Sequence, residues 1–228
     1  MKTAVVVEPR TDTPSFSDLL TRLFPTVTTR DLLRLSTGTP SGREHEWFFW
    51  RRNGGHWTHP VGVATGAGDR PETIVAANSD TTITWSPFLY GSPASTSTAP
   101  ARLAAVWATF PLAAHPHPQR GFGSMLDPDS ERLVLARLRA VTPAPSLILH
   151  EGLRISALWR LREPLGDLTR IERLLWHMGT KLGADRTATL EPRAMTFAVP
   201  GAPMRGVFPR RDVAILAMTE RDYSPDQL

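Results

Sequence analysis

Residues 145–161, PSLILHEGLRISALWRL, constrain the fold of this chain more than any other segment. The apolar runs on either side of Gly152 predict a buried strand, a turn at the glycine and a second strand that ends near Trp159. Such a unit needs a sheet around it. With 228 residues, 41% of them hydrophobic, the chain is long and apolar enough to enclose that sheet in a core.

The N-terminal part predicts two short amphipathic helices followed by strands. The first helix is capped by Ser15 or Ser17 and ended by Pro25, and the second is capped by Thr28 or Thr29. Their inward sides are expected to be Leu19, Leu20 and Leu23 for the first helix, and Leu32, Leu33 and Leu35 for the second. Strands are expected at residues 45–52, 72–77 and 81–90.

The remaining part alternates strands and longer helices. After a buried strand at residues 103–112, Asp127 or Asp129 starts a helix, and Asp167 or Thr169 starts another that ends at Gly183. The buried faces are expected to be Leu133, Val134, Leu138 and Val141 in the first, and Ile171, Leu174, Leu175, Met178 and Leu182 in the second. Short strands are expected within residues 194–201 and 212–218. The pattern predicts a single α+β domain over residues 1–228, with one lobe over about 1–100 and another over about 101–215.

Composition excludes several classes of protein. The chain has no cysteine, which excludes disulfides and thiolate metal sites. It has no apolar run near the roughly 20 residues that span a bilayer, and its N-terminus lacks the pattern of a signal peptide. We therefore expect a cytoplasmic protein without a membrane partner.

The basic residues are mostly arginine and are unevenly distributed. Only Lys2 and Lys181 of the 26 basic residues are lysines. Between residues 132 and 211, fourteen Lys and Arg face six Asp and Glu, a local excess of eight positive charges. Arginine binds phosphate bidentately through its planar fork, so this region favours a polyanionic partner. A solvated basic face without a ligand, on a chain whose genome favours arginine codons, remains the alternative.

The strand-turn-strand unit resembles the second motif of the archaeo-eukaryotic primase-polymerase family. In that motif a strand enters a Ser-Gly-x-Gly-x-His turn and an aromatic-rich strand follows. Without gaps, Pro145, Ser146, Gly152 and Trp159 match the pattern. The serine of the motif falls on Glu151, its second glycine on Arg154 and its catalytic histidine on Ser156.

The other two motifs of the family are matched in outline without their acidic residues. The acidic pair of the first motif falls on Thr109 and Pro111, in the strand RLAAVWATFPL. In the third, the Pro200-Gly201 pair fits, but the catalytic acid falls on Leu190 or, with a shift of one residue, on Glu191. The resemblance covers about residues 18–211. It implies a primase-polymerase-like fold with a central mixed or antiparallel sheet flanked by helices, whose catalytic positions Thr109, Pro111, Ser156, Leu190 and Glu191 are vestigial.

Three functional hypotheses follow from the resemblance. The first is a catalytically degenerate protein that needs no cofactor and binds DNA or RNA, or a replication partner, in plasmid- or phage-type DNA replication. The second is an active primase that uses Mg²⁺ or Mn²⁺ held by relocated carboxylates, with Asp127, Asp129, Asp185 and Glu191 as the candidates. The third is an accessory subunit that binds only protein. The acids at the helix start are also expected as caps, which favours the first hypothesis.

The candidate nucleic-acid contacts are all cationic or aromatic. The phosphate contacts expected under the first hypothesis are Arg154, Lys181, Arg160, Arg193 and Arg205. His150 is interpreted as a partly buried strand residue, with a phosphate contact as the alternative. Trp47, Trp50, Trp57 and Trp85 are candidates for base stacking or for the core.

Overall fold

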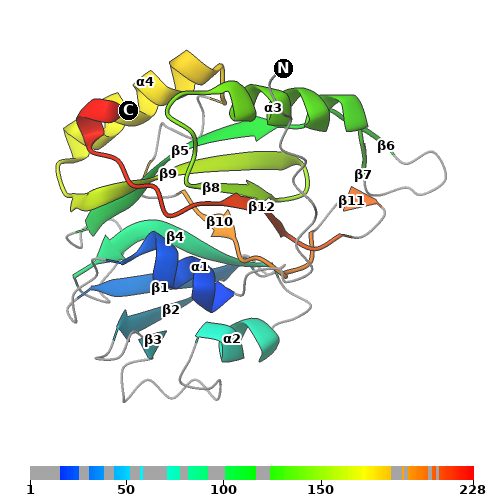
Figure 1. The fold of residues 1–228 in the computed structure, drawn as a ribbon. Coiled ribbons are helices and arrows are strands. Elements are labelled where there is room, and N and C mark those ends of the chain that lie inside the picture. Colours follow the sequence, from blue (N-terminus) through cyan, green and yellow to red (C-terminus); the bar gives the residue numbers. More distant parts are fainter. Residues whose placement is uncertain are drawn as a thin grey trace.

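The computed structural model describes residues 16–25, 31–38, 44–51, 57–58, 71–77, 82–91, 101–116, 124–185, 192, 195–204, 207–208 and 211–228. The helices are α1 (Phe16–Leu23), α2 (Pro71–Ala77), α3 (Pro128–Ala140), α4 (Leu168–Leu182) and the short 3₁₀ helix η3 (Pro225–Gln227). The strands are β1 (Leu32–Gly38), β2 (Glu44–Arg51), β3 (Trp57–Thr58), β4 (Ile83–Tyr90), β5 (Ala101–Pro111), β6 (Ala114–Pro116), β7 (Ser124–Leu126), β8 (Leu147–His150), β9 (Arg154–Leu165), β10 (Phe197–Ala198), β11 (Val207–Phe208) and β12 (Ala214–Met218). Figure 1 shows their arrangement.

One long antiparallel sheet organises the described residues. Its strand order is β12-β8-β9-β5-β4-β1-β2-β3, and β10 pairs with β4 beside this path. A smaller sheet joins β11, β7 and β6, with β11 and β7 parallel. The fold is therefore α+β with a central antiparallel sheet, as the sequence predicts.

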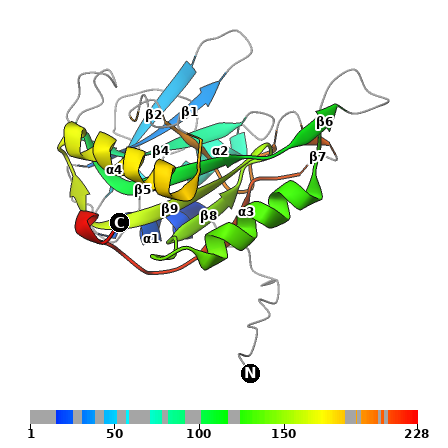
Figure 2. The same cartoon turned by 90° about the horizontal axis from the view of Figure 1, so that it is seen from above.

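The helices lie against different parts of the long sheet. α4 packs on β5 and α3 packs on β9, and both lie on the same side of these strands in Figures 1 and 2. α1 lies in the half of the molecule that also holds α2, and the two helices contact each other (Figure 1). No helix of the described residues is long and apolar enough to cross a bilayer.

Most of the elements expected from the sequence are present. The unit at residues 145–161 forms β8, a turn at Gly152 and β9. α3 and α4 begin after Asp127 and Asp167, whose side chains accept hydrogen bonds from Asp129 N–H and Arg170 N–H. Gly183 ends α4 in the left-handed conformation, with φ 60°. The strands expected at residues 45–52, 81–90, 103–112, 194–201 and 212–218 correspond to β2, β4, β5, β10 and β12.

Two N-terminal expectations are wrong. Leu32, Leu33 and Leu35 lie in β1, a strand paired with β2 on one side and β4 on the other, and not in a helix. All three are buried, and a strand enclosed on both faces reads as a continuous apolar run that resembles a buried helix. Thr28 and Thr29, the expected caps, lie outside the described residues. Residues 71–77, expected to contain a strand, form α2, which starts at Pro71 as helices commonly do.

Two side-chain positions within the helices also differ from expectation. α1 already begins at Phe16, so Ser17 lies inside the helix, and Ser15 is outside the described residues. Leu133 was expected on the buried face of α3 but is 67% exposed. Val134, Leu138 and Val141 recur at spacings of four and three residues and face the core, whereas Leu133 lies about 100° further round the helix.

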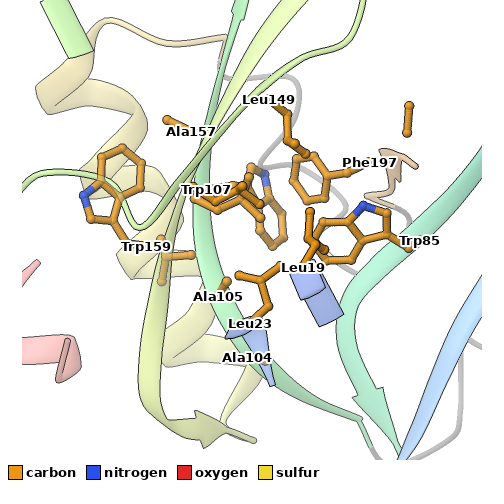
Figure 3. Packing of buried hydrophobic residues seen from close by; sticks show 14 of the residues in the cluster. Leu19, Leu23, Trp85, Ala104, Ala105, Trp107, Leu149, Ala157, Trp159 and Phe197 are labelled. Atoms are coloured by element: carbon orange, nitrogen blue, oxygen red, sulfur yellow. The ribbon is translucent and has the colours of Figure 1, made fainter. Parts of the chain in front are cut away.

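An aromatic cluster joins β4, β5 and β10. Phe197 packs against Trp85 at 5.4 Å and against Trp107 at 5.9 Å between ring centroids. All three side chains are fully buried (Figure 3). Because β10 is only two residues long, these ring contacts and its pairing with β4 hold it against the face of β5. The face it covers carries the positions that the sequence marks as vestigial.

Candidate functional site

The positions that the resemblance assigns to the first two motifs meet across one strand pair. β5 and β9 are antiparallel, with Thr109 opposite Ser156 and Pro111 opposite Arg154. Opposed residues in such a pair, and residues two apart on one strand, project from the same face of a sheet. These four side chains therefore share one face. In the resemblance this face carries the acidic pair, the second glycine and the catalytic histidine.

A buried carboxylate, Glu151, occupies this face. Its side chain is only 2% exposed. Arg154 donates to both of its oxygens, from Nε to Oε2 at 3.1 Å and from Nη2 to Oε1 at 3.0 Å. Oε2 also accepts from the Ser156 hydroxyl, and Oε1 accepts from the Ala198 N–H at 2.6 Å. Four donors, two of them on the Arg154 guanidinium, thus satisfy a charge that would otherwise be costly to bury.

The turn at Gly152 holds Glu151 in place. Gly152 has φ +83°, a conformation that other residues adopt only with strain. A β-carbon at this position would lie 3.0 Å from Cγ2 of Val207, so the turn also lacks space for a side chain. Glu151 N–H donates to Arg154 O at 2.9 Å, which closes the turn next to the carboxylate.

The segment around β10 covers the site and bonds to both Glu151 and Arg154. Besides the Ala198 N–H, which binds Glu151, the carbonyl of Thr196 accepts from Arg154 Nη2 at 2.9 Å. Segments from the second and third motifs, more than 40 residues apart in the sequence, are thereby joined at one carboxylate. Ser156 and Thr109 beneath them are buried, at 0% and 3% exposure.

The side chains on this face do not fit a divalent metal ion. Mg²⁺ and Mn²⁺ are held mainly by carboxylate oxygens, and Thr109, Pro111 and Ser156 supply none. Among the described residues of this face, Glu151 is the one carboxylate. Both of its oxygens accept from N–H and O–H donors, and the Arg154 guanidinium repels a second cation. A metal would have to displace this network.

The relocated acids do not form a metal site in the described part of the chain. Asp127 caps α3, and Asp129 pairs with Arg132 at 3.1 Å. Asp185 follows α4, where its N–H donates to the Thr109 carbonyl at 2.8 Å. No group of three His, Asp or Glu side chains among the described residues could share a metal ion. Glu191 and Leu190 lie outside these residues.

The expected phosphate contacts have very different environments. Arg154 is 37% exposed although it is bound to Glu151. Arg160 is buried, donates to the carbonyls of Arg22 and Glu220, and lies 3.6 Å from Asp222. Nη1 and Nη2 of Arg160 thus bond to main-chain carbonyls inside the protein, and its phosphate contact stays a prediction. Lys181 is exposed on α4, and Arg193 and Arg205 lie outside the described residues.

His150 is enclosed between β8 and α3. Its Nδ1 accepts from Gly152 N–H at 3.3 Å, and its Nε2 lies 3.6 Å from Oε2 of Glu131, just beyond hydrogen-bonding distance. Burial lowers the pKa of His150, and Arg211 lowers it further, whereas Glu131 and Glu151 raise it by less in total. The imidazole, 3% exposed, therefore matches the buried-strand interpretation better than the phosphate contact.

Solved structures share this architecture, although no protein-family model and no curated protein sequence matches the chain. The AEP domain of the cyanophage S-2L primase-polymerase superposes with a TM-score of 0.55 at 17% identity, covering 92% of each chain. The catalytic domain of primase RepB′ in complex with initiator DNA superposes with a TM-score of 0.53 at 8% identity, covering 92% of this chain and 89% of that one. The chain has a primase-polymerase fold. A further structure of primase RepB′ agrees, with a TM-score of 0.52 at 9% identity, covering 92% of this chain and 58% of that one.

Within the primase-polymerase fold, sequence reasoning located the strands of the site but missed its main contact. It treated Glu151 and Arg154 as separate departures from the motif, whereas they bind each other. Their spacing of three residues around a glycine turn was the available signal. The contribution of β10 had no such signal, because it depends on packing between distant segments. Trp85 belongs to the core, and the side chains of Trp47, Trp50 and Trp57 lie outside the described part.

Proposed function

We propose that this protein is a catalytically silent primase-polymerase-like protein that binds nucleic acid in plasmid- or phage-type DNA replication. The observation that carries this proposal is the closed network of Glu151, Arg154 and Ser156 on the β5–β9 face. In the resemblance the corresponding positions serve catalysis. Here their side chains bind one another.

The chemistry of nucleotidyl transfer explains why this network argues against catalysis. Phosphoryl transfer relies on metal ions that neutralise the charge developing at the transferred group and activate the attacking hydroxyl. A site for them needs open, converging carboxylates. Among the described residues of this face, the one buried carboxylate is already neutralised by a guanidinium, so these residues offer no free negative charge to a metal ion.

Binding of nucleic acid is supported by charge and by one structural relative. The excess of eight positive charges between residues 132 and 211 attracts a polyanion. The RepB′ catalytic domain of the same fold was solved with initiator DNA bound. Arg154 contributes to the proposed surface, since Nη1 makes no hydrogen bond within the described residues and the side chain is 37% exposed. Arg193 and Arg205 remain proposed phosphate contacts. We also propose that the protein acts in the cytoplasm, where a replication protein would be its second partner.

The test is a binding and extension experiment on the full chain. Labelled single-stranded and duplex DNA would be titrated at several salt concentrations, with and without Mg²⁺, Mn²⁺ and nucleotides, and primer extension would be scored in the same tubes. We expect metal-independent binding whose affinity falls steeply with salt, and no extension. Extension would show that the protein is an active enzyme, and absence of binding would move the function to protein contacts alone.

A further inference from the structure

The outward face of α4 is basic and aromatic. Ile171, Leu175, Met178 and Leu182 are buried against the sheet. The opposite side of the helix exposes Arg173, Trp176, His177, Thr180 and Lys181. At 100° per residue, Arg173, Trp176 and Thr180 occupy one stripe at spacings of three and four residues. The stripe is exposed to solvent, whereas the buried side of α4 packs on β5. Figure 2 shows α4 lying over this strand.

Trp176 differs from the other tryptophans whose side chains are described. Trp85, Trp107 and Trp159 are fully buried, whereas Trp176 is 51% exposed. A half-exposed tryptophan contributes less hydrophobic free energy to folding than a buried one. Exposed indoles between cations are typical of surfaces on which unpaired bases stack.

The charge around Trp176 is positive and available. α4 carries Arg170, Arg173 and Lys181 against Glu172 as its one acid. Arg170 is held by Asp226 at 2.8 Å. Arg173 and Lys181 form no ion pair with any described residue, so their charges face solvent. This leaves a cation one helical turn before Trp176 and another just over one turn after it.

A hollow continues this face at the C-terminal end of α4. It has a volume of about 550 Å³, opens widely to solvent and is lined by Arg137, Val141, Thr180, Lys181 and Gly183, among others. Arg137 Nη1 donates to the Leu182 carbonyl at 3.1 Å, which anchors the guanidinium at the rim. Arg137 from α3 and Lys181 from α4 thus line the same hollow, next to the stripe formed by Arg173, Trp176 and Thr180.

We propose that single-stranded nucleic acid binds along the outward face of α4, with a base stacked on Trp176 and the backbone phosphates next to Arg173, Lys181 and Arg137. This rests on the proposed nucleic-acid binding and adds a second binding surface, separate from the one around Arg154, together with the form of nucleic acid that it binds. Bases in a duplex are already stacked and cannot present their faces to an indole, so this surface favours single strands. The site is on the face of the sheet opposite to the vestigial catalytic positions.

The experiment compares wild-type protein with three variants on a fluorescein-labelled oligothymidylate and on a duplex of equal length. Trp176→Ala removes the stacking surface, and Trp176→Phe retains an aromatic ring. The double variant Arg173→Gln/Lys181→Gln removes two charges. Arg132→Gln is the matched control, since Arg132 is equally basic and 77% exposed but lies at the other end of α3. Circular dichroism confirms that each variant is folded.

We expect Trp176→Ala to weaken single-strand binding about tenfold and duplex binding by much less, with Trp176→Phe in between. The double charge variant should lower the slope of log K against log salt by about 1.4 on single strands. Intrinsic fluorescence should be quenched by the oligonucleotide in wild-type protein and much less in Trp176→Phe. Arg132→Gln should behave as wild type.

The outcomes separate this inference from the proposed function. If wild-type protein binds nucleic acid and the α4 variants bind equally well, the α4 surface is wrong while the proposed function stands. If wild-type protein binds neither oligonucleotide, both the proposed function and the α4 binding site are wrong. If Trp176→Ala weakened the affinity for single strands and for duplex equally, Trp176 would not stack on an unpaired base.

Discussion

Thr109 on β5 lies directly opposite Ser156 on β9. The two residues are separated by 46 others in the sequence, and the resemblance assigns one to the acidic pair and the other to the histidine of the primase-polymerase site. Their pairing shows that the two motifs were aligned to neighbouring strands. Glu151, which accepts a hydrogen bond from Ser156, therefore lies beside the positions that the resemblance assigns to both motifs.

The Glu151–Arg154 pair should stabilise the fold only as a pair. Arg154→Ala leaves a carboxylate that is 2% exposed without its cation, so the free energy of unfolding should fall by about 3 kcal/mol. The double variant Glu151→Gln/Arg154→Ala removes the buried charge too. Its loss of unfolding free energy should be clearly smaller than the sum of the losses in Glu151→Gln and Arg154→Ala. Urea unfolding of the wild type, the two single variants and the double variant measures this coupling. Additive losses would show that the contact contributes nothing.

Three glycines separate backbone strain from lack of space. Gly152→Ala should destabilise the protein by about 2 kcal/mol or more, because it combines φ +83° with a β-carbon 3.0 Å from Val207. Gly201 has the same φ with no atom within 4 Å of its β-carbon, so Gly201→Ala should show the strain alone, about 1 kcal/mol. Gly166 has an ordinary φ and only Arg102 Cγ at 3.8 Å, so Gly166→Ala should cost nothing measurable. Thermal midpoints that ranked the three differently would contradict this account.

His150 should make the protein sensitive to acid. Its folded-state pKa lies below the ordinary histidine value of about 6.5, chiefly because of burial, so the unfolded chain binds more protons. Stability is therefore full above pH 6.5 and is lost as the pH falls from 6.5 towards the lower folded value. Urea midpoints of wild type and His150→Asn across this range should converge on acidification, since asparagine keeps an acceptor for Gly152 N–H but does not titrate.

The neighbours of His150 give a second test of the same effect. Glu131, 3.6 Å away, raises the pKa of His150, and Arg211 lowers it. Glu131→Gln should therefore lower the pKa of His150 further and increase the loss of stability in acid. A smaller loss in Glu131→Gln would contradict the assignment to His150.

Arg160 should matter for stability and not for nucleic-acid binding. Arg160→Met leaves the carbonyls of Arg22 and Glu220 without their donor, so unfolding should become about 2 to 4 kcal/mol easier. Arg162 is the matched control: it neighbours Arg160, is 61% exposed and pairs with Asp222 at 3.2 Å, so Arg162→Met should cost about 0.5 kcal/mol or less. Folded Arg160→Met should bind DNA as wild type does. A specific loss of affinity would restore Arg160 as a contact.

The sequence was sufficient where structure is encoded locally. The glycine turn between β8 and β9, the caps Asp127 and Asp167, and the left-handed Gly183 each follow from the chemistry of one or two residues. It was insufficient where the secondary structure of a segment depends on the elements packed around it. Leu32 and Leu33 form a strand because β2 and β4 enclose them, and a short apolar run does not reveal such neighbours.

The same distinction holds for the candidate site. The departures at Glu151, Arg154 and Ser156 are visible in the sequence as losses, one residue at a time. That they form one network depends on the Ala198 N–H and the Thr196 carbonyl, which packing of Phe197 between Trp85 and Trp107 brings to the site. Trp176 was missed for the opposite reason, since a tryptophan beside the apolar stripe of a helix is normally taken as part of it.

The network around Glu151 also makes its members depend on one another. Exchanging Ser156 alone for histidine places an imidazole against a carboxylate that is already saturated, and exchanging Arg154 alone for glycine leaves that carboxylate buried without its cation. Each of these single exchanges is expected to give a less stable protein. The three residues are therefore energetically coupled, so that exchanging one of them alone should cost more stability than exchanging all three together.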